Sequence, residues 1–195
     1  MCALVANARS QQETVKCVGS GHSFTSAAVT QGHLISLDNW SGIVSIDRST
    51  LQVTVKAGTT LAVLNELLHA EGLALPNLGD IAYQTVAGAI STSTHGTGVT
   101  LTGLAGQVRG FTLIDGRGEV VHCNHEDNSD IFDVGRVSVG ALGVITHYTL
   151  QAVPAFRLHA VERALPLDVV LERLDEFVDD NDHFEFFWLP HTPWA

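Results

Sequence analysis

The stretch from residue 76 to residue 98 constrains this chain most, because it is long, almost uncharged and built mainly of small side chains. Its one charged residue is Asp80, and glycine, alanine, serine or threonine fills most other positions. Because these side chains are small, the backbone N–H groups can come close to a bulky anionic or planar ligand. The alternative is a buried crossing of glycine and alanine between packed elements, and this stretch alone does not decide between the two.

A short helix is expected inside this stretch. Thr85 can cap residues 86–90, since its hydroxyl can accept a hydrogen bond from a backbone N–H group in the first helical turn. The free N–H groups and the dipole at such a helix start favour phosphate or another anion. The pattern therefore predicts an anion-binding turn at Thr85.

A second candidate ligand loop covers residues 19–24, directly after a predicted strand. Glycines at alternate positions there allow a turn whose N–H groups surround a pyrophosphate. The same residues could open a Rossmann fingerprint, with Asp38 as the acid that binds the ribose. Phe24 replaces the third glycine of that fingerprint, and residues 25–32 are too short and too rich in threonine and valine for its crossover helix.

The rest of the chain predicts a mixture of helices and strands. Alternating apolar and polar residues predict hairpins, and apolar residues three and four apart predict helices. A third strip of small residues, 140–146, leads into a strand, so three such strips suggest one elongated ligand. The predicted strands are 15–18, 33–37, 44–47, 52–56, 108–114, 119–123, 146–153, 156–161 and 182–189. The predicted helices are 3–13, 61–71, 86–90, 128–137 and 166–178.

Composition excludes several classes of protein. With 195 residues and a net charge of −11, the chain would repel the phosphates of a nucleic acid, so no nucleic-acid partner is expected. Cys2, Cys17 and Cys123 match no zinc or redox spacing, which favours a reducing, cytoplasmic setting. No apolar run is long enough for a signal peptide or a membrane span. Residues 122–125 contain two histidines and a cysteine, but four metal ligands cannot be named, so a polar loop without metal is expected.

Six motifs occur in order along the chain, at residues 18–24, 76–80, 85–88, 92–96, 140–145 and 183–187. Together they closely resemble the sugar-1,4-lactone oxidases, which are the gulonolactone, arabinonolactone and alditol oxidase group of the vanillyl-alcohol-oxidase (PCMH-type) flavoproteins. The resemblance covers nearly the whole chain. It implies an α+β fold, with a PCMH-type FAD-binding domain of two α+β lobes in residues 1–153 and the beginning of a cap domain in residues 154–195.

The resemblance also implies which residues bind FAD. The pyrophosphate loop would consist of Val18, Gly19, Ser20, Gly21, His22 and Ser23. The phosphates, the ribityl chain and the isoalloxazine edge would be lined by Asp80, Thr85, Gly88, Thr92, Ser93, Thr94, His95 and Gly96. The adenine would meet main-chain atoms of Val144 and Ile145.

Two histidines in this set have alternative roles. His22 occupies the position that many relatives bond covalently to the flavin 8α-methyl carbon, and the alternative is a hydrogen bond to the flavin or a phosphate. His95 either contacts the flavin or is a packing residue that orients the glycine turn.

The implied activity is that of an FAD-dependent oxidoreductase. A hydride would pass from the carbon beside a hydroxyl of a sugar lactone or polyol to flavin N5, and O₂ or another acceptor would reoxidise the flavin. Relatives carry their acidic, arginine and lysine substrate residues in the cap and tail, so no catalytic residue is expected in this chain, which resembles the flavin-binding part of an oxidase cut at both ends. The alternatives are an inactive FAD-binding remnant and a Rossmann-type NAD(P)-binding protein.

Overall fold

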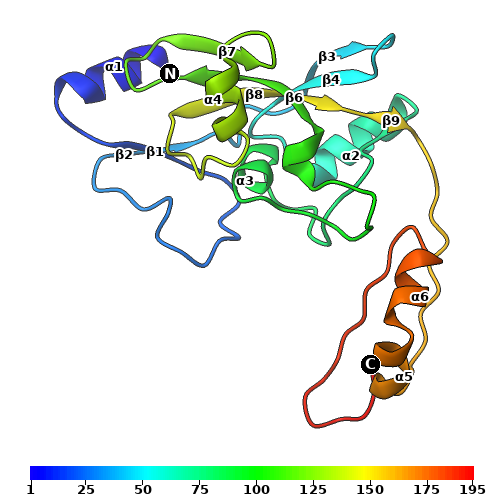
Figure 1. Ribbon diagram of the computed structural model, residues 1–195. Coiled ribbons are helices and arrows are strands. Elements are labelled where there is room, and N and C mark those ends of the chain that lie inside the picture. Colours follow the sequence, from blue (N-terminus) through cyan, green and yellow to red (C-terminus); the bar gives the residue numbers. More distant parts are fainter.

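A five-stranded antiparallel sheet forms the centre of the computed structural model, which describes residues 1–195 (Figure 1). The strands come from two hairpins and one later strand that lies between them. In spatial order they are β3 (Ile43–Asp47), β4 (Gln52–Lys56), β8 (Val144–Gln151), β6 (Val108–Ile114) and β7 (Val120–Asn124). Both hairpins predicted from alternating residues are therefore confirmed.

One face of this sheet packs against helices and forms the main core. The helices are α2 (Leu61–Ala70), α3 (Val86–Ser91) and α4 (Ser129–Gly135), and a short 3₁₀ turn, η1 (Leu104–Gln107), lies beside α3. Their buried apolar side chains join those of β4, β6 and β8 in one cluster of 22 residues. A threonine caps each of α2 and α3: the Thr60 hydroxyl accepts from the Val63 N–H group at 3.3 Å, and the Thr85 hydroxyl accepts from the Gly88 N–H group at 3.1 Å. The predicted cap at Thr85 is therefore confirmed.

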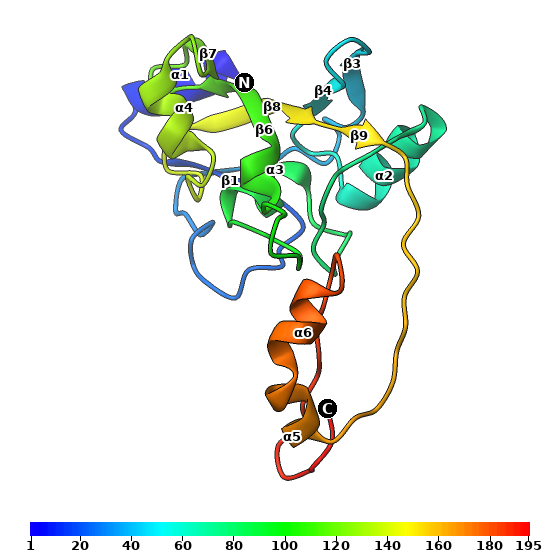
Figure 2. The ribbon, with the colours of Figure 1, turned by 45° about the vertical axis from the view of Figure 1, so that its right-hand side comes forward.

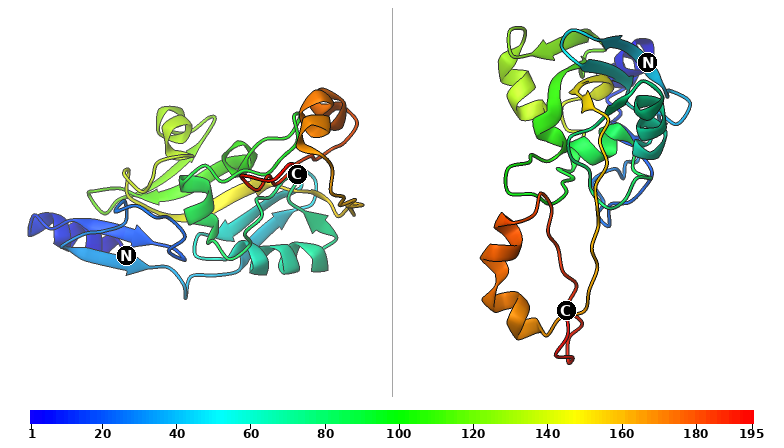
Figure 3. Two further views of the ribbon diagram at one scale, coloured as in Figure 1. Left: turned by 90° about the horizontal axis from the view of Figure 1, so that it is seen from below. Right: turned by 90° about the vertical axis from the view of Figure 1, so that its right-hand side faces the viewer.

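A smaller unit lies beside one end of the sheet (Figure 3). It contains α1 (Cys2–Ser10) and two parallel strands, β1 (Val15–Val18) and β2 (His33–Ser36). The connection between these strands has turns and bends but no helix, so the crossover helix of the Rossmann alternative is absent. The two strands bring the 19–24 loop to the side of α3.

The C-terminal part extends away from the sheet (Figure 2). After β9 (Val153–Pro154), which pairs with β5 (Leu73–Ala74), the chain leads to α5 (Leu167–Glu172) and α6 (Leu174–Asp179). The predicted helix over 166–178 is thus divided at Arg173, whose φ of −106° and ψ of 20° depart from helical values. A hydrogen bond of 3.1 Å between the Thr97 hydroxyl and His183 Nδ1 connects this part to the main body.

Two predicted strands in this part, 156–161 and 182–189, are wrong, because both segments are irregular. Their apolar side chains are present but largely exposed, as for Phe156, Leu158 and Val161. A strand needs a neighbour to receive its backbone hydrogen bonds, and no strand lies beside either segment.

The other face of the main sheet is polar and carries a row of side chains in register across four strands. Lys56 pairs with His147, His147 with Thr112, and Thr112 with His122. The pKa of His147 is lowered, first by burial and then by the positive charges of Lys56 and His122. Protonating His147 is therefore less favourable in the folded chain than in the unfolded chain.

We expect this shift to make the protein less stable in mild acid. Above the ordinary histidine pKa of 6.5 both states hold His147 neutral, but as the pH falls below that value the unfolded chain binds the proton first. Urea unfolding at several pH values between about 5 and 7.5 should show stability rising with pH in wild type and rising less in His147→Gln. Lys56→Met should also reduce the slope, and equal slopes in all three proteins would contradict this account.

Candidate functional site

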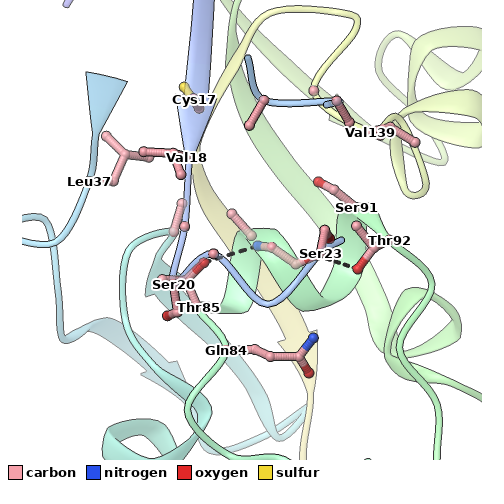
Figure 4. Close-up of a pocket in the computed structure, with 18 of the residues that line it drawn as sticks. Cys17, Val18, Ser20, Ser23, Leu37, Gln84, Thr85, Ser91, Thr92 and Val139 are labelled. Carbon is pink, nitrogen blue, oxygen red and sulfur yellow. Dashed lines mark hydrogen bonds between the residues drawn. The ribbon is translucent and has the colours of Figure 1, made fainter. Parts of the chain in front are cut away.

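A cavity of about 170 Å³ lies between the 19–24 loop and α3 (Figure 4). Three segments that are far apart in sequence line it: residues 16–23, several residues of 84–92, and several of 139–145. These are the three strips of small residues identified in the sequence. They converge on one cavity, as one elongated ligand would require.

Most of the predicted site residues lie in this cavity wall. Those that line it are Val18, Gly19, Ser20, Gly21, His22, Ser23, Thr85, Gly88, Thr92 and Ile145. Those outside its wall are Asp80, Ser93, Thr94, His95, Gly96 and Val144. The structure therefore brings the first loop, the start of α3 and Ile145 together, but not the 93–96 turn.

The first loop touches the start of α3 at Thr85. A Cβ atom on Gly19 would lie only 2.4 Å from the Thr85 hydroxyl oxygen, so a side chain at position 19 would push the loop away from the helix. The same hydroxyl caps α3 through Gly88. Thr85 is thus the point at which two of the three predicted ligand segments meet.

The backbone N–H groups of the first loop are free. From Gly19 to Ser23, none of them donates to an acceptor of the protein. The N–H groups of Gly140 and Gly143, which line the opposite wall, also have no acceptor. A series of unbonded donors around a cavity is the arrangement in which a backbone binds phosphate oxygens.

The predicted anion-binding turn at the start of α3 is wrong in its detail. The N–H groups of the first turn are already used: Val86 donates to the Thr59 carbonyl at 2.7 Å and Ala87 to the Ala57 carbonyl at 3.0 Å, while Gly88 donates to the Thr85 hydroxyl. The carbonyls of Ala57 and Thr59, just before α2, therefore already accept from N–H groups that a phosphate would need as donors. The loop at 19–23 supplies free donors in its place.

The turn at residues 93–96 lies just outside the cavity and is held by side chains. The side-chain amide of Gln84 donates to the Thr94 hydroxyl at 3.2 Å, and Gln84 lines the cavity. Asn77 donates to the Thr97 carbonyl at 3.1 Å and to the Thr102 carbonyl at 3.2 Å. The exposed His95 places its Nδ1 atom 3.0 Å from the Gly96 carbonyl oxygen.

The two remaining predicted residues also have other surroundings. Asp80 is exposed outside the cavity. The side chain of Val144 packs with Val5 and Ile114 in a small apolar cluster, which leaves only its main-chain atoms for the predicted contact.

Sequence reasoning did not identify several residues of the wall, including Lys16, Cys17, Leu37, Gly58, Gln84 and Val139. Lys16 is the only lysine or arginine among the residues lining the cavity, and no carboxylate lines it. In a chain of net charge −11 this local excess of positive charge favours an anionic ligand. The position of Lys16 just before the glycine loop is the sequence signal that could have predicted a positive charge at this site.

The cysteines and histidines do not form a second kind of site. All three cysteines are free, and burial raises the pKa of Cys17 to about 11, so its thiol keeps its proton. No group of three histidine, cysteine or acidic side chains is arranged to hold a metal ion. Residues 122–124 are part of β7, so the polar loop expected at 122–125 is mainly a strand.

No helix combines the length and the apolar character that crossing a membrane requires.

Two family models match this sequence. The model described as "FAD binding domain" matches residues 1–124. The model described as "D-arabinono-1,4-lactone oxidase" matches residues 148–195.

Curated relatives are similar along almost the whole chain. L-gulono-1,4-lactone dehydrogenase of Mycobacterium tuberculosis is 43% identical over 189 residues, which are 97% of this chain and 44% of the relative. L-gulonolactone oxidase of Mus musculus is 41% identical over 97% of this chain and 43% of the relative. D-arabinono-1,4-lactone oxidase of Yarrowia lipolytica is 34% identical over 97% of this chain and 37% of the relative. The chain thus spans less than half the length of these relatives.

Among solved structures, cholesterol oxidase from Brevibacterium sterolicum has a similar fold. It matches with a TM-score of 0.71 at 18% sequence identity, over 80% of this chain and 32% of that chain.

Proposed function

Because this chain belongs to the FAD-binding domain family, we propose that it is the flavin-binding part of an oxidoreductase that acts on a sugar lactone or polyol. Its cofactor is FAD, and its fold is the PCMH-type α+β fold. The observation that carries the proposal is the ring of unbonded backbone N–H groups around a cavity that holds one lysine and no carboxylate.

The residues present fit FAD in three respects. Gly19 allows close approach of the loop to Thr85, the N–H groups from Gly19 to Ser23 can bind the pyrophosphate, and Lys16 can offset its charge. Thr92 and Ile145 would contact the remainder of the cofactor from the facing walls. The turn at 93–96, with Asp80 and Val144, would extend the site along the same groove.

When it is bound, FAD supplies the redox chemistry by accepting a hydride from the carbon that is oxidised. The part of this chain is to bind and orient the cofactor. We propose that residues 1–153 do this, that residues 154–195 begin a cap over the substrate, and that the protein works in the cytoplasm with O₂ or another electron acceptor. Three free cysteines support the reducing compartment.

We also propose that His22, which lines the cavity, is the covalent anchor of the flavin. Purified protein should be yellow, and acid precipitation should leave the colour in the pellet. His22→Ala should release the colour into the supernatant, because no bond then retains the flavin. The control His95→Ala, outside the cavity, should keep the colour in the pellet.

The outcomes of this experiment separate the possibilities. Colour in the supernatant of wild type would leave His22 as a hydrogen-bonding residue only. Colourless wild type after incubation with FAD would contradict the proposed function. A coloured protein that does not oxidise a lactone or a polyol in a steady-state assay would be a flavin-binding part without activity of its own.

A further inference from the structure

Two buried hydroxyl groups close to the cavity have no hydrogen-bond partner. They belong to Tyr148, in the middle strand β8, and to Ser138, in the loop after α4. The Tyr148 side chain is fully buried among core residues, with an exposed fraction of 0%. Buried hydroxyls nearly always have a partner, so an unpaired one beside a ligand cavity calls for an explanation.

Ser91 connects these hydroxyls to the cavity. It is the last residue of α3, which packs on β8, and it lines the cavity wall next to Thr92 (Figure 4). Its side chain lies beside the Tyr148 hydroxyl without a hydrogen bond of normal geometry. Its carbonyl accepts from the Val139 N–H group at 3.2 Å, which places the loop containing Ser138 against the same helix end.

The Tyr148 hydroxyl is available as a hydrogen-bond donor. Burial raises its pKa, and the neighbouring Ser91 hydroxyl only partly opposes this, so Tyr148 keeps its proton at neutral pH. A serine at a helix end can turn its own proton back toward a carbonyl of the preceding turn. The Ser91 oxygen can accept from Tyr148 whichever way its own proton points, so with a ligand bound that proton can turn into the cavity.

We infer that Tyr148 is a positioning residue for the cofactor: its hydroxyl donates to Ser91 Oγ, and Ser91 in turn donates its proton to a polar atom of bound FAD. This inference rests on the proposed function, because it concerns the same cavity. Without the ligand the Tyr148 hydroxyl remains unpaired, and with the ligand the pair of hydroxyls forms a chain of two hydrogen bonds.

This role predicts opposite effects on the free and the loaded protein. Tyr148→Phe removes a buried hydroxyl that has no partner, so the melting temperature without FAD should stay the same or rise. The affinity for FAD should fall about 3- to 10-fold, which corresponds to one neutral hydrogen bond. If Tyr148 only filled the core, Tyr148→Phe would lower both the melting temperature without FAD and the affinity for FAD.

The test is a cycle of four proteins: the parent, Tyr148→Phe, Ser91→Ala and the double variant. All carry His22→Ala so that binding is reversible, and the Kd for FAD is measured from the quenching of flavin fluorescence. Tyr148→Phe should weaken binding in the parent and have no further effect in the Ser91→Ala protein. Tyr83→Phe is the matched control, since Tyr83 is 72% exposed and lies outside the cavity wall.

Three results would overturn the inference, two of them measured as FAD affinity. One is an unchanged Kd in Tyr148→Phe, and the other is the same loss of affinity whether or not Ser91 is present. A lower melting temperature of Tyr148→Phe without FAD would show a packing role instead. Failure of the wild-type chain to bind FAD at all is a different result, because it would contradict the proposed function itself.

Discussion

Gly58→Ala is expected to destabilise the protein by about 1–3 kcal/mol, the usual range for an overfilled site, and to weaken FAD binding about tenfold or more. A Cβ atom at position 58 would lie 1.9 Å from the Leu37 carbonyl oxygen and 2.9 Å from the Trp40 carbonyl oxygen. Both are backbone atoms, so the segment after β2 would have to move away from the segment after β4. Gly58 and Leu37 both line the cavity, and the movement would widen it.

Urea unfolding and FAD titration of Gly58→Ala check this prediction. Gly116→Ala is the matched control: Gly116 is in the turn between β6 and β7, and a Cβ atom there would have no atom within 4 Å. The control should leave both stability and affinity nearly unchanged. Wild-type affinity in Gly58→Ala would show that the two segments do not have to touch for FAD to bind.

Phe132→Ala is expected to cost about 3–5 kcal/mol of stability, the range for removing a buried aromatic side chain. Phe132 is fully buried on α4, and its ring stacks on that of Phe111 in β6 at a centroid distance of 5.9 Å. It therefore holds α4 against the sheet. The loop that follows α4 carries Val139 and Gly140 into the cavity wall, so FAD affinity should fall as well.

Val134→Ala is the control on the same helix, because the Val134 side chain is 62% exposed. It should change the free energy of unfolding by less than about 0.5 kcal/mol, as surface substitutions usually do. Alanine has the highest helix propensity, so neither loss can come from propensity, and equal losses in the two variants would contradict a specific packing role of Phe132.

Features that depend on nearby residues were predictable from the sequence. The two hairpins, the leucine-rich helix α2 and the threonine cap of α3 each follow from residues within a few positions of one another, and each is confirmed. The resemblance to the lactone oxidases also depended on short motifs. It is confirmed by the two family models and by relatives that match 97% of this chain.

Features that depend on distant partners were not predictable. The segment 156–161 has the alternating pattern of a strand, but the pattern does not reveal whether a neighbouring strand exists. The start of α3 has the residues of an anion site, but they do not reveal that Ala57 and Thr59 already accept its hydrogen bonds.

The same limit applies to the cavity. Leu37 lines the cavity because it follows β2, and Ser91 lines it because it ends α3, which packs on β8. The roles of individual cofactor residues, including His22, remain predictions that the proposed experiments test.

The position of β8 sets the order in which the molecule can be assembled. Strands β3 and β4 can pair as soon as residue 56 has been synthesised, and β6 and β7 can pair by residue 124, but neither hairpin pairs with the other through backbone hydrogen bonds. Only β8 joins them, through pairs such as Gln52 with Gln151, which require a long loop of chain to close. Ile145 of the cavity wall arrives with that strand, so we expect FAD to find a complete cavity only at the last step of folding.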